Sequence, residues 1–333
     1  MYILGLESSC DETSCAIVEI AEGKRRILAN IIASQIDIHR LYGGVVPEIA
    51  GRAHIEAVSR ITKEALDSAG LSLSDIGLCA VTSHPGLIGA LLVGVNFGKS
   101  LAFANNIPLV GVDHVKGHVA AAYLEYQTLE PPFLGVVLSG GHTSFYVVKS
   151  YTEYEEIGST RDDAAGEAFD KIGRVIGLPY PGGAALDRLA YEGDKNAYKL
   201  PSPALSGDTL DFSFSGLKTA ALNLINTAAQ KGEEINRADL AASFTGVIAD
   251  GFSKKLKAAI ERTGLKTVVL AGGVSANSHL RAAAKAVCDK KGATLCLPPL
   301  SLCGDNAAMI ATQGYYEYIN GQKDGTDLNA SAV

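Results

Sequence analysis

Two histidines set four residues apart are the residues of this sequence best suited to binding a metal. His114 and His118 lie in the segment VDHVKGHVAAAYLEY, which is expected to be helical. Residues four apart on a helix share one face, so both imidazoles can reach a single ion. Asp305, in the segment LCGDN, can complete a His-His-carboxylate site that leaves positions open for substrate. The ordinary alternatives are packing or solvated histidines and an N-cap role for Asp305.

Two polar turns between expected strands are candidates for the remaining chemistry. The turn Ser139-Gly140-Gly141-His142-Thr143 leaves backbone N–H groups available and lets an anion approach closely, so it is a candidate phosphate cradle. An ordinary glycine hairpin is the alternative. The first turn of the chain carries Asp11 and Glu12 at the matching positions, and these carboxylates would offer a base or metal site.

A third glycine-containing turn, AGGVSAN, links an expected strand to a helix and ends at Asn277. Its glycines allow a flat nucleobase or ribose to lie against the backbone, with Asn277 as helix cap or ligand contact. It is not the dinucleotide fingerprint G-x-G-x-x-G. Asp170 and Asp187 are surface charges by default, although Asp187 follows the rigid Pro-Gly-Gly turn that ends at Gly183.

Composition sets the class of protein. The chain has 333 residues, 47% of them hydrophobic, which favours two folded domains. No signal peptide or membrane-spanning stretch is expected, and six scattered cysteines favour a reduced cytosolic setting. A net charge of −7 argues against a strongly basic nucleic-acid binder, so RNA contacts must depend on local patches or on a partner.

The order of expected elements suggests an internal duplication. Leu4-Gly5 and Thr13-Ser14 are separated as Leu134-Gly135 and Thr143-Ser144 are, and both stretches read strand, polar turn, strand. We therefore expect a duplicated βββαβα unit in an α/β protein. The expected domains are 1–112 and 113–305, the second carrying the metal and nucleotide site, and a final helix at about 306–320 packs back on the first domain.

The motifs in combination resemble the TsaD family of tRNA N6-adenosine threonylcarbamoyltransferases. The resemblance runs from about Tyr2 to Tyr318, and the ESSCDET turn is of the bacterial type. It rests on these motifs: LESSCDETS, GGVVPEIAGRAH, PGLIGALLVG, DHVKGH, LSGGHT, GEAFDKIGRVIGLPYPGG, FSFSGLKTA, AGGVSANSHLR and LCGDNAAMIA.

The resemblance implies a fold and a set of site residues. The fold is the actin, Hsp70 and sugar-kinase superfold, in which two ribonuclease-H-like domains enclose an interdomain cleft. His114, His118 and Asp305 would bind one divalent metal ion, Fe²⁺ before Zn²⁺, and Asp11 with Glu12 would serve the chemistry. The substrate-binding residues would be Val137, Leu138, Ser139, Gly140, Gly141, Asp170, Gly183, Asp187 and Asn277.

The resemblance also implies a reaction and partners. The threonylcarbamoyl group of L-threonylcarbamoyladenylate would pass to N6 of the adenosine at position 37 of tRNAs that read codons starting with A, and AMP would leave. The implied partners are tRNA, a TsaB-like paralogue and a TsaE-like ATPase. An adenine nucleotide (ATP, ADP or an AMP analogue) could occupy the same cleft. The implied location is the cytoplasm, with no membrane contact.

Three alternatives remain at this level. A metallopeptidase is disfavoured because Val115 stands where the zincin motif has its Glu, and Gly117 interrupts the helix. An ATPase or kinase of the same superfold would share the polar turns but would not need a His-His-Asp site. A scaffold that only binds partners would not need the complete set of motifs.

Overall fold

A computed structural model describes all residues, 1–333, and their contacts divide the chain into two units. The first comprises Met1–Pro131, Ser150–Glu153 and Pro298–Val333, and the second comprises Pro132–Lys149 and Tyr154–Leu297. The boundary expected after residue 112 differs from this division, because the helix that begins at His114 groups with the first unit. The last helix, expected at about 306–320, also groups with the first unit, where it packs on the sheet.

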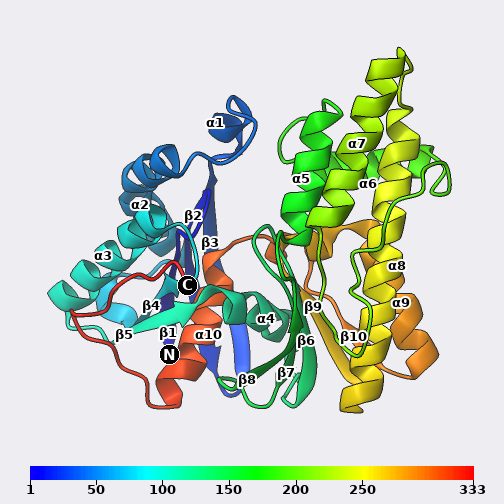
Figure 1. Cartoon of the computed structure of the whole chain (residues 1–333). Coiled ribbons are helices and arrows are strands. Elements are labelled where there is room, and N and C mark those ends of the chain that lie inside the picture. The colour runs from blue at the N-terminus through cyan, green and yellow to red at the C-terminus, as the bar shows by residue number, and fades with distance from the viewer. The chain divides into compact units, whose positions relative to one another are not determined.

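The first unit is built on a five-stranded sheet of order β3-β2-β1-β4-β5 (Figure 1). β1 pairs antiparallel with β2 and parallel with β4. Its strands are β1 (Tyr2–Glu7), β2 (Glu12–Ala21), β3 (Lys24–Ser34), β4 (Ile76–His84) and β5 (Leu109–Asp113). Its helices are α1 (Ile36–Arg40), α2 (Pro47–Ala69), α3 (Ile88–Asn105), α4 (His114–Glu125) and α10 (Ala307–Ile319), with short 3₁₀ turns at Leu73–Asp75 and Leu300–Leu302.

Alternating side chains of β1 give the first sheet two buried faces. Ile3 points into a core shared with α4 and α10, whereas Leu4 points into a core shared with α2 and α3. Pro47 opens α2 and Gly70, with a φ of 67°, ends it. The sheet is therefore covered by helices on both sides, and its strand ends carry the polar turns.

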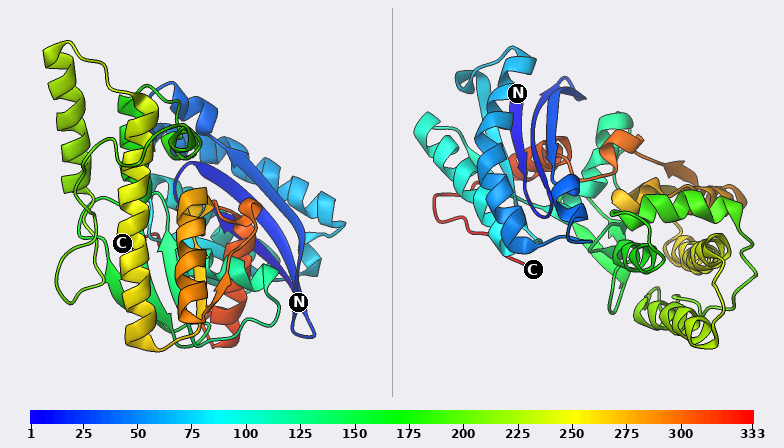
Figure 2. Two further views of the ribbon diagram at one scale, coloured as in Figure 1. Left: turned by 90° about the vertical axis from the view of Figure 1, so that its right-hand side faces the viewer. Right: turned by 90° about the horizontal axis from the view of Figure 1, so that it is seen from above.

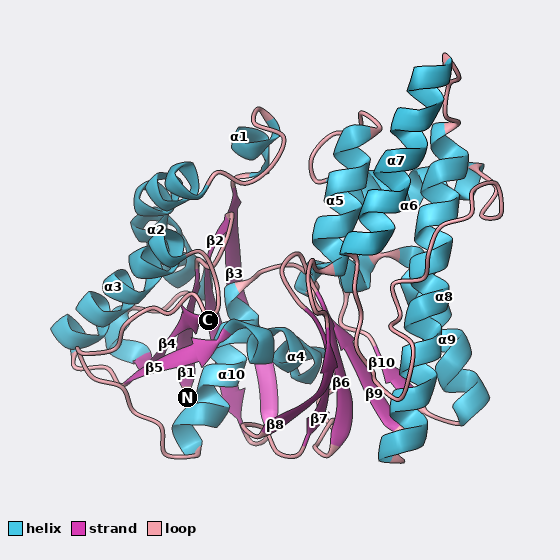
Figure 3. Ribbon diagram, viewed as in Figure 1, coloured by secondary structure: helices cyan, strands magenta, loops and turns pink.

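The second unit repeats the topology with the sheet order β8-β7-β6-β9-β10 (Figure 3). Its strands are β6 (Phe133–Leu138), β7 (Thr143–Val148), β8 (Tyr154–Ser159), β9 (Thr267–Ala271) and β10 (Thr294–Cys296). Its helices are α5 (Ala165–Val175), α6 (Gly182–Leu189), α7 (Ser215–Lys231), α8 (Arg237–Thr263) and α9 (Ser278–Lys291), with 3₁₀ turns at Ala190–Glu192 and Gly273–Ala276. These helices share one core with the sheet, and α8 lies beside α9 (Figure 2).

The duplication expected from the sequence is confirmed at the level of strand register. Leu4 pairs with Ile17 in the first sheet, and Leu134 pairs with Val147 in the second, so the two hairpins are related by a constant offset of 130 residues. The parallel pairs β1–β4 and β6–β9 occupy the same places in their sheets. Each unit therefore carries the same strand–turn–strand feature, with Asp11 and Glu12 in one copy and Gly141 and His142 in the other.

α3 is the one helix that is long and apolar enough to cross a membrane. A third of its apolar window is buried, and residues such as Leu91 and Val95 pack into the core of the first unit. A Cβ at Gly94 would lie 2.4 Å from the hydroxyl of Ser8, so the helix sits close against the β1–β2 turn. α3 is therefore partly buried in the core of the first unit.

Candidate metal centre and substrate-binding turns

The two histidines begin α4 because Asp113 caps this helix. Asp113 Oδ1 accepts hydrogen bonds from the backbone N–H groups of Val115 (2.7 Å) and Lys116 (3.3 Å). His114 and His118 then stand one turn apart, with ring centroids 4.5 Å from each other at an interplanar angle of 72°. Their side chains are 7% and 0% exposed, so both imidazoles face the interior of the first unit.

Asp305 joins the histidines because the neighbouring residue takes the capping role. Asn306, not Asp305, is the N-cap of α10, and its Oδ1 accepts the N–H of Met309 at 3.1 Å. Asp305 Oδ1 lies 3.5 Å from His114 Nε2 and 3.4 Å from His118 Nε2. The N-cap alternative weighed for Asp305 is therefore wrong, and its carboxylate is placed with the imidazoles.

The three side chains fit a metal ion. Their ligand atoms all lie within 4.8 Å of one another. Metal–ligand bonds of about 2.0–2.1 Å in a tetrahedral site separate ligand atoms by about 3.3–3.4 Å, close to the two nitrogen–oxygen distances found here. Two imidazoles and one carboxylate suit zinc or iron better than calcium or magnesium. The buried His/His/Asp group could therefore hold one transition-metal ion.

Glu7 is a site residue that the sequence analysis missed. Its Oε2 lies 2.9 Å from His114 Nδ1 and accepts a hydrogen bond from Thr82 Oγ1 (2.7 Å), while its Oε1 accepts one from the N–H of Ser9 (2.5 Å). Because a carboxylate only accepts, Nδ1 of His114 carries a proton, and Nε2 is the nitrogen left to bind an ion. Glu7 lies in the LESSCDETS motif, but nothing in the sequence links it to His114, which is 107 residues away.

The electrostatics of this group favour positive charge. Burial alone would lower the pKa of His114, but Glu7 and Asp305 raise it to about 9. Burial alone would raise the pKa of Glu7, but His114, Ser9 and Thr82 hold it at about 2. The pKa of Asp305 is raised to about 6 by burial together with the charges of Glu7 and Asp11. These carboxylates give the buried pocket the sign that a cation needs.

The predicted catalytic turn, which carries Asp11 and Glu12, lies in the same unit and raises the pKa of Asp305. Asp11 is 7% exposed and ends the β1–β2 turn. Glu12 accepts a hydrogen bond from Ser34 Oγ at 3.1 Å, and burial together with the charges of Asp11 and Asp305 raises the pKa of Glu12 to about 9. Asp305 raises the pKa of Glu12, and Asp11 raises the pKa of Asp305, so the carboxylate turn lies close to the His114, His118 and Asp305 group.

In the second unit, three glycine-containing motifs meet around the β6–β7 turn. The N–H of Gly166, in the first turn of α5, donates to the carbonyl of Ser139 at 3.3 Å. A Cβ at Gly166 would lie 2.7 Å from that carbonyl, and one at Gly272 would lie 2.4 Å from the carbonyl of Leu138. Gly140 has open space where a Cβ would stand. The turn therefore exposes backbone beside the start of α5.

The predicted substrate residues fall into two groups by their contacts. Val137 and Leu138 are buried, so they can offer only backbone atoms, while Ser139 Oγ accepts the N–H of His142 at 3.0 Å. The N–H of Gly183 donates to Asp170 Oδ1 at 2.9 Å, which ties α6 to α5.

Asp187, in α6, and Asn277, the N-cap of α9, both bind the first turn of α9. Asp187 accepts hydrogen bonds from Ser278 N–H (3.1 Å) and Ser278 Oγ (3.1 Å), and its Oδ1 lies 2.8 Å from His279 Nδ1. Asn277 caps α9 by accepting the N–H of Leu280 at 3.0 Å. Both side chains therefore have structural partners, and any nucleotide contact would be additional to them.

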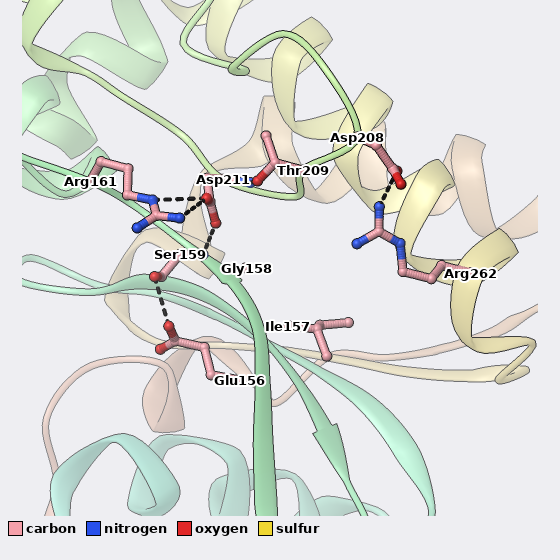
Figure 4. Close-up of a pocket in the computed structure, with 9 residues that line it drawn as sticks. All are labelled: Glu156, Ile157, Gly158, Ser159, Arg161, Asp208, Thr209, Asp211 and Arg262. Atoms are coloured by element: carbon pink, nitrogen blue, oxygen red, sulfur yellow. Dashed lines mark hydrogen bonds and ion pairs between the residues drawn. The ribbon is translucent and has the colours of Figure 1, made fainter.

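A polar cavity of about 290 Å³ lies elsewhere in the second unit (Figure 4). Arg161 forms an ion pair with Asp211, and Arg262 forms one with Asp208, so each of these charges in the cavity wall has a partner of opposite sign. The buried Lys255 donates to the carbonyls of Leu205 and Thr209 and holds the adjoining loop. None of the residues that line the cavity was predicted as a site residue. The lining consists of Glu156, Ile157, Gly158, Ser159, Arg161, Asp208, Thr209, Asp211 and Arg262.

The repeated topology defines the actin-like class of two-unit α/β proteins. Solved structures agree: HypF from T. kodakarensis matches with a TM-score of 0.65 at 14% identity, over 96% of this chain and 48% of that one. Component A of (R)-2-hydroxyglutaryl-CoA dehydratase from Acidaminococcus fermentans matches with a TM-score of 0.55 at 16% identity, over 96% and 99% of the two chains. At these identities the likeness shows the fold alone.

The sequence comparisons identify the family. The family model "TsaD: tRNA N6-adenosine threonylcarbamoyltransferase" matches residues 26–312. A protein of that name from Clostridium botulinum (strain 657 / Type Ba4) is 52% identical over 329 residues, 98% of this chain and 96% of the relative. One from Clostridioides difficile (strain 630) is 48% identical over 327 residues, with the same coverage. The chain belongs to the TsaD family, and it is an acyltransferase that forms threonylcarbamoyladenosine in tRNA.

Proposed function

We propose that the chain transfers the threonylcarbamoyl group of L-threonylcarbamoyladenylate to N6 of adenosine 37 in tRNAs that read codons starting with A. The exocyclic amine attacks the carbamoyl carbon, the bond from that carbon to the phosphate oxygen breaks, and AMP leaves with the bonding electrons. The amine loses one proton to a base. The observation that carries the proposal is the buried His114, His118 and Asp305 group beside the Asp11 turn, in a chain of the TsaD family.

Asp11 is the proposed base. The amine of adenosine is a weak nucleophile, so a carboxylate that takes its proton during the attack lowers the barrier. Glu12, whose pKa is raised to about 9, is neutral at pH 7, so it already holds a proton and is not the base. Glu12 supports the turn through its hydrogen bond with Ser34.

The metal ligands are His114, His118 and Asp305, with Fe²⁺ the first expectation and Zn²⁺ the second. When bound, a divalent ion supplies Lewis-acid stabilisation of charge on the acyl phosphate. Glu7 holds the proton on Nδ1 of His114, which keeps Nε2 available as a ligand. One ion per chain is expected.

The second unit is proposed to bind the adenylate. The backbone from Val137 to Gly141 and the start of α5 offer N–H groups to the phosphate, because Gly140 and Gly141 carry no side chain to keep an anion away. The nucleotide part would contact Asp170, Gly183, Asp187 and Asn277. ATP, ADP or an AMP analogue would compete for the same residues.

The proposed partners are tRNA, a TsaB-like paralogue and a TsaE-like ATPase, in the cytoplasm and away from membranes. The helices α2 and α3 would supply the surface for the paralogue. Ile55 and Phe103, on these helices, are 65% and 78% exposed, and exposed apolar side chains of this size suit a protein interface.

The test is Asp11→Asn in a reaction with purified tRNA, threonylcarbamoyladenylate and the partner proteins. Transfer, read by nucleoside mass spectrometry, should fall by about 100-fold or more, while the Kd for the adenylate stays within about threefold. Asp37→Asn is the matched control, because Asp37 is an acidic residue of the same unit whose side chain is 90% exposed. Full transfer by Asp11→Asn would reject the base assignment.

A further inference from the structure

The motif GGVVPEIAGRAH, which no step above uses, ends at a fully buried histidine that contacts the catalytic turn. His54 lies on the inner face of α2 and is 0% exposed. Its Nε2 is 3.0 Å from the carbonyl of Cys10, and its Nδ1 is 2.7 Å from the hydroxyl of Thr13. The imidazole therefore bridges the two residues that flank Asp11 and Glu12.

The acceptors and donors around His54 fix its tautomer. The carbonyl of Cys10 can only accept, so Nε2 of His54 must carry the proton. Nδ1 then accepts from the hydroxyl of Thr13, and Gln35 Nε2 lies 3.4 Å from the same Nδ1. Burial lowers the pKa of His54, which is consistent with a neutral ring in this position.

The same logic extends to a second buried histidine. The N–H of Val46 can only donate, and it lies 3.3 Å from Nδ1 of His39, so the proton of His39 must be on Nε2. The Nε2–H of His39 donates to Gln35 Oε1 at 3.1 Å. The backbone N–H of Gln35 in turn donates to the carbonyl of Asp11 at 3.0 Å. A single chain of hydrogen bonds thus runs from Val46 to the turn, with every donor facing an acceptor.

We propose that His54 is a positioning residue for transfer: it clamps the Cys10–Thr13 turn at both flanks and so fixes the direction of the Asp11 carboxylate, with Gln35 and His39 holding His54 in one orientation. The inference rests on the proposed role of Asp11. His54 is fully buried and both of its ring nitrogens are bonded within the unit, so it acts through the turn. A misplacement of about 1 Å in a catalytic group can cost about 100-fold in rate.

The experiment compares three variants in the complete transfer reaction. His54→Leu removes both hydrogen bonds, whereas His54→Gln keeps one amide N–H for Cys10 and one carbonyl for Thr13. Val58→Ala is the control, because Val58 is buried one turn further along the same face of α2 and is 6% exposed. It loosens the packing without touching the turn.

The expected result is a kcat about 100-fold lower for His54→Leu, with KM for the adenylate and Zn²⁺ affinity each within about threefold of wild type. His54→Gln should recover most of the lost kcat, and Val58→Ala should keep its activity despite a lower Tm. Wild-type kcat in a folded His54→Leu, or losses in His54→Leu and Val58→Ala that simply follow their Tm values, would overturn the proposal.

A second readout does not depend on the chemistry of Asp11. Amide hydrogen exchange at Gln35, whose N–H is bound to the Asp11 carbonyl, should speed up by about tenfold or more in His54→Leu and not in Val58→Ala. Nitrogen chemical shifts should show a neutral His54 with its proton on Nε2. If Asp11→Asn proved fully active while these measurements held, the base assignment would fail and the clamp would stand. A protonated His54, or unchanged exchange, would overturn the clamp itself.

Discussion

Replacing Glu7 by Gln should weaken metal binding while leaving the chain folded. The carboxylate of Glu7 faces three donors: His114 Nδ1 at 2.9 Å, Thr82 Oγ1 at 2.7 Å and the N–H of Ser9 at 2.5 Å. A Gln side chain has one accepting oxygen, so its amide N–H₂ must face a donor. If it faces His114, the imidazole proton moves to Nε2, the atom that should bind the ion.

The size of the effect follows from the ligand that is lost or misdirected. Removing an outer-shell partner typically lowers metal affinity by about 10- to 100-fold, which corresponds to about 1.4–2.7 kcal/mol at 25 °C. The three-donor environment makes the upper part of this range the expectation. The measurement is Zn²⁺ affinity by competition with a chromophoric chelator, with stoichiometry checked by elemental analysis.

Asp113→Asn supplies the matched control. It also removes an acidic group beside His114, but Asn is an equally good N-cap, so α4 keeps its start. We expect its Zn²⁺ affinity to stay within about threefold of wild type, since it contacts neither ligand nitrogen. Equal Zn²⁺ affinity in wild type and a folded Glu7→Gln would refute the reasoning, and so would equal losses in the two variants, because charge alone would then explain them.

Three further predictions follow from contacts in the two units. Zn²⁺ at about 100 times its Kd should stabilise the wild-type chain by about 2.7 kcal/mol, seen as a higher Tm, and His118→Ala should abolish that shift; a shift that survives would place the ion elsewhere. Gly166→Ala puts a Cβ 2.7 Å from the Ser139 carbonyl and 2.8 Å from Gly140 Cα, so it should cost about 1–3 kcal/mol and weaken adenylate binding, measured by denaturation and titration calorimetry. Gly216→Ala, which has open space in α7, should do neither. Burial would raise the pKa of Asp211, but Ser159, Thr209 and Arg161 hold it below its usual value. A carboxylate whose pKa is depressed in the folded state stabilises the fold at pH values above its unfolded pKa. Asp211→Asn should therefore lower the free energy of unfolding at pH 7 by about 1–3 kcal/mol, measured by urea denaturation. That difference should shrink as the pH falls below about 4; a constant difference would show that the charge is not what stabilises.

The duplication could be predicted because short sequence pairs repeat at the same spacing in both halves. Leu-Gly and Thr-Ser recur with the same separation in both halves, and the same register of β1–β2 and β6–β7 follows from it. The ends of α2 were predictable for a similar reason, since Pro47 and Gly70 have fixed backbone preferences. Signals of this kind involve neighbours in sequence, and no distant contact has to be known.

Other elements lacked such a signal. The duplicated βββαβα unit implies a third strand in the second half, but the sequence does not mark its range, because the YEEIGS sequence of β8 carries two glutamates, and these prove to be exposed on the edge of the second sheet. The boundary expected at 112 split α4 from the sheet on which it packs, since β5 and α4 adjoin without a linker. Glu7 and His54 read as ordinary polar residues in sequence, and only their partners far along the chain give them a role.

The position of Asp305 shows how the fold supplies a ligand that helix spacing cannot. It stands 187 residues beyond His118 and depends on how α10 is seated. A Cβ at Gly5 would lie 2.2 Å from the Ala307 carbonyl, so the start of α10 rests directly on β1. Ser14 Oγ accepts the N–H of Ala307 at 2.9 Å, and Asn306 caps the helix.

These contacts fix the residue before the cap, and that residue is Asp305. α4 is seated against the same helix, because a Cβ at Gly117 would lie 2.7 Å from the Ile310 side chain. The glycine inside the His-Val-Lys-Gly-His segment, which disfavours a zincin helix, therefore has a packing reason of its own. It lets α4 and α10 approach closely enough to place the ligand atoms of two imidazoles and a carboxylate far along the chain within 4.8 Å of one another, where they could hold one ion.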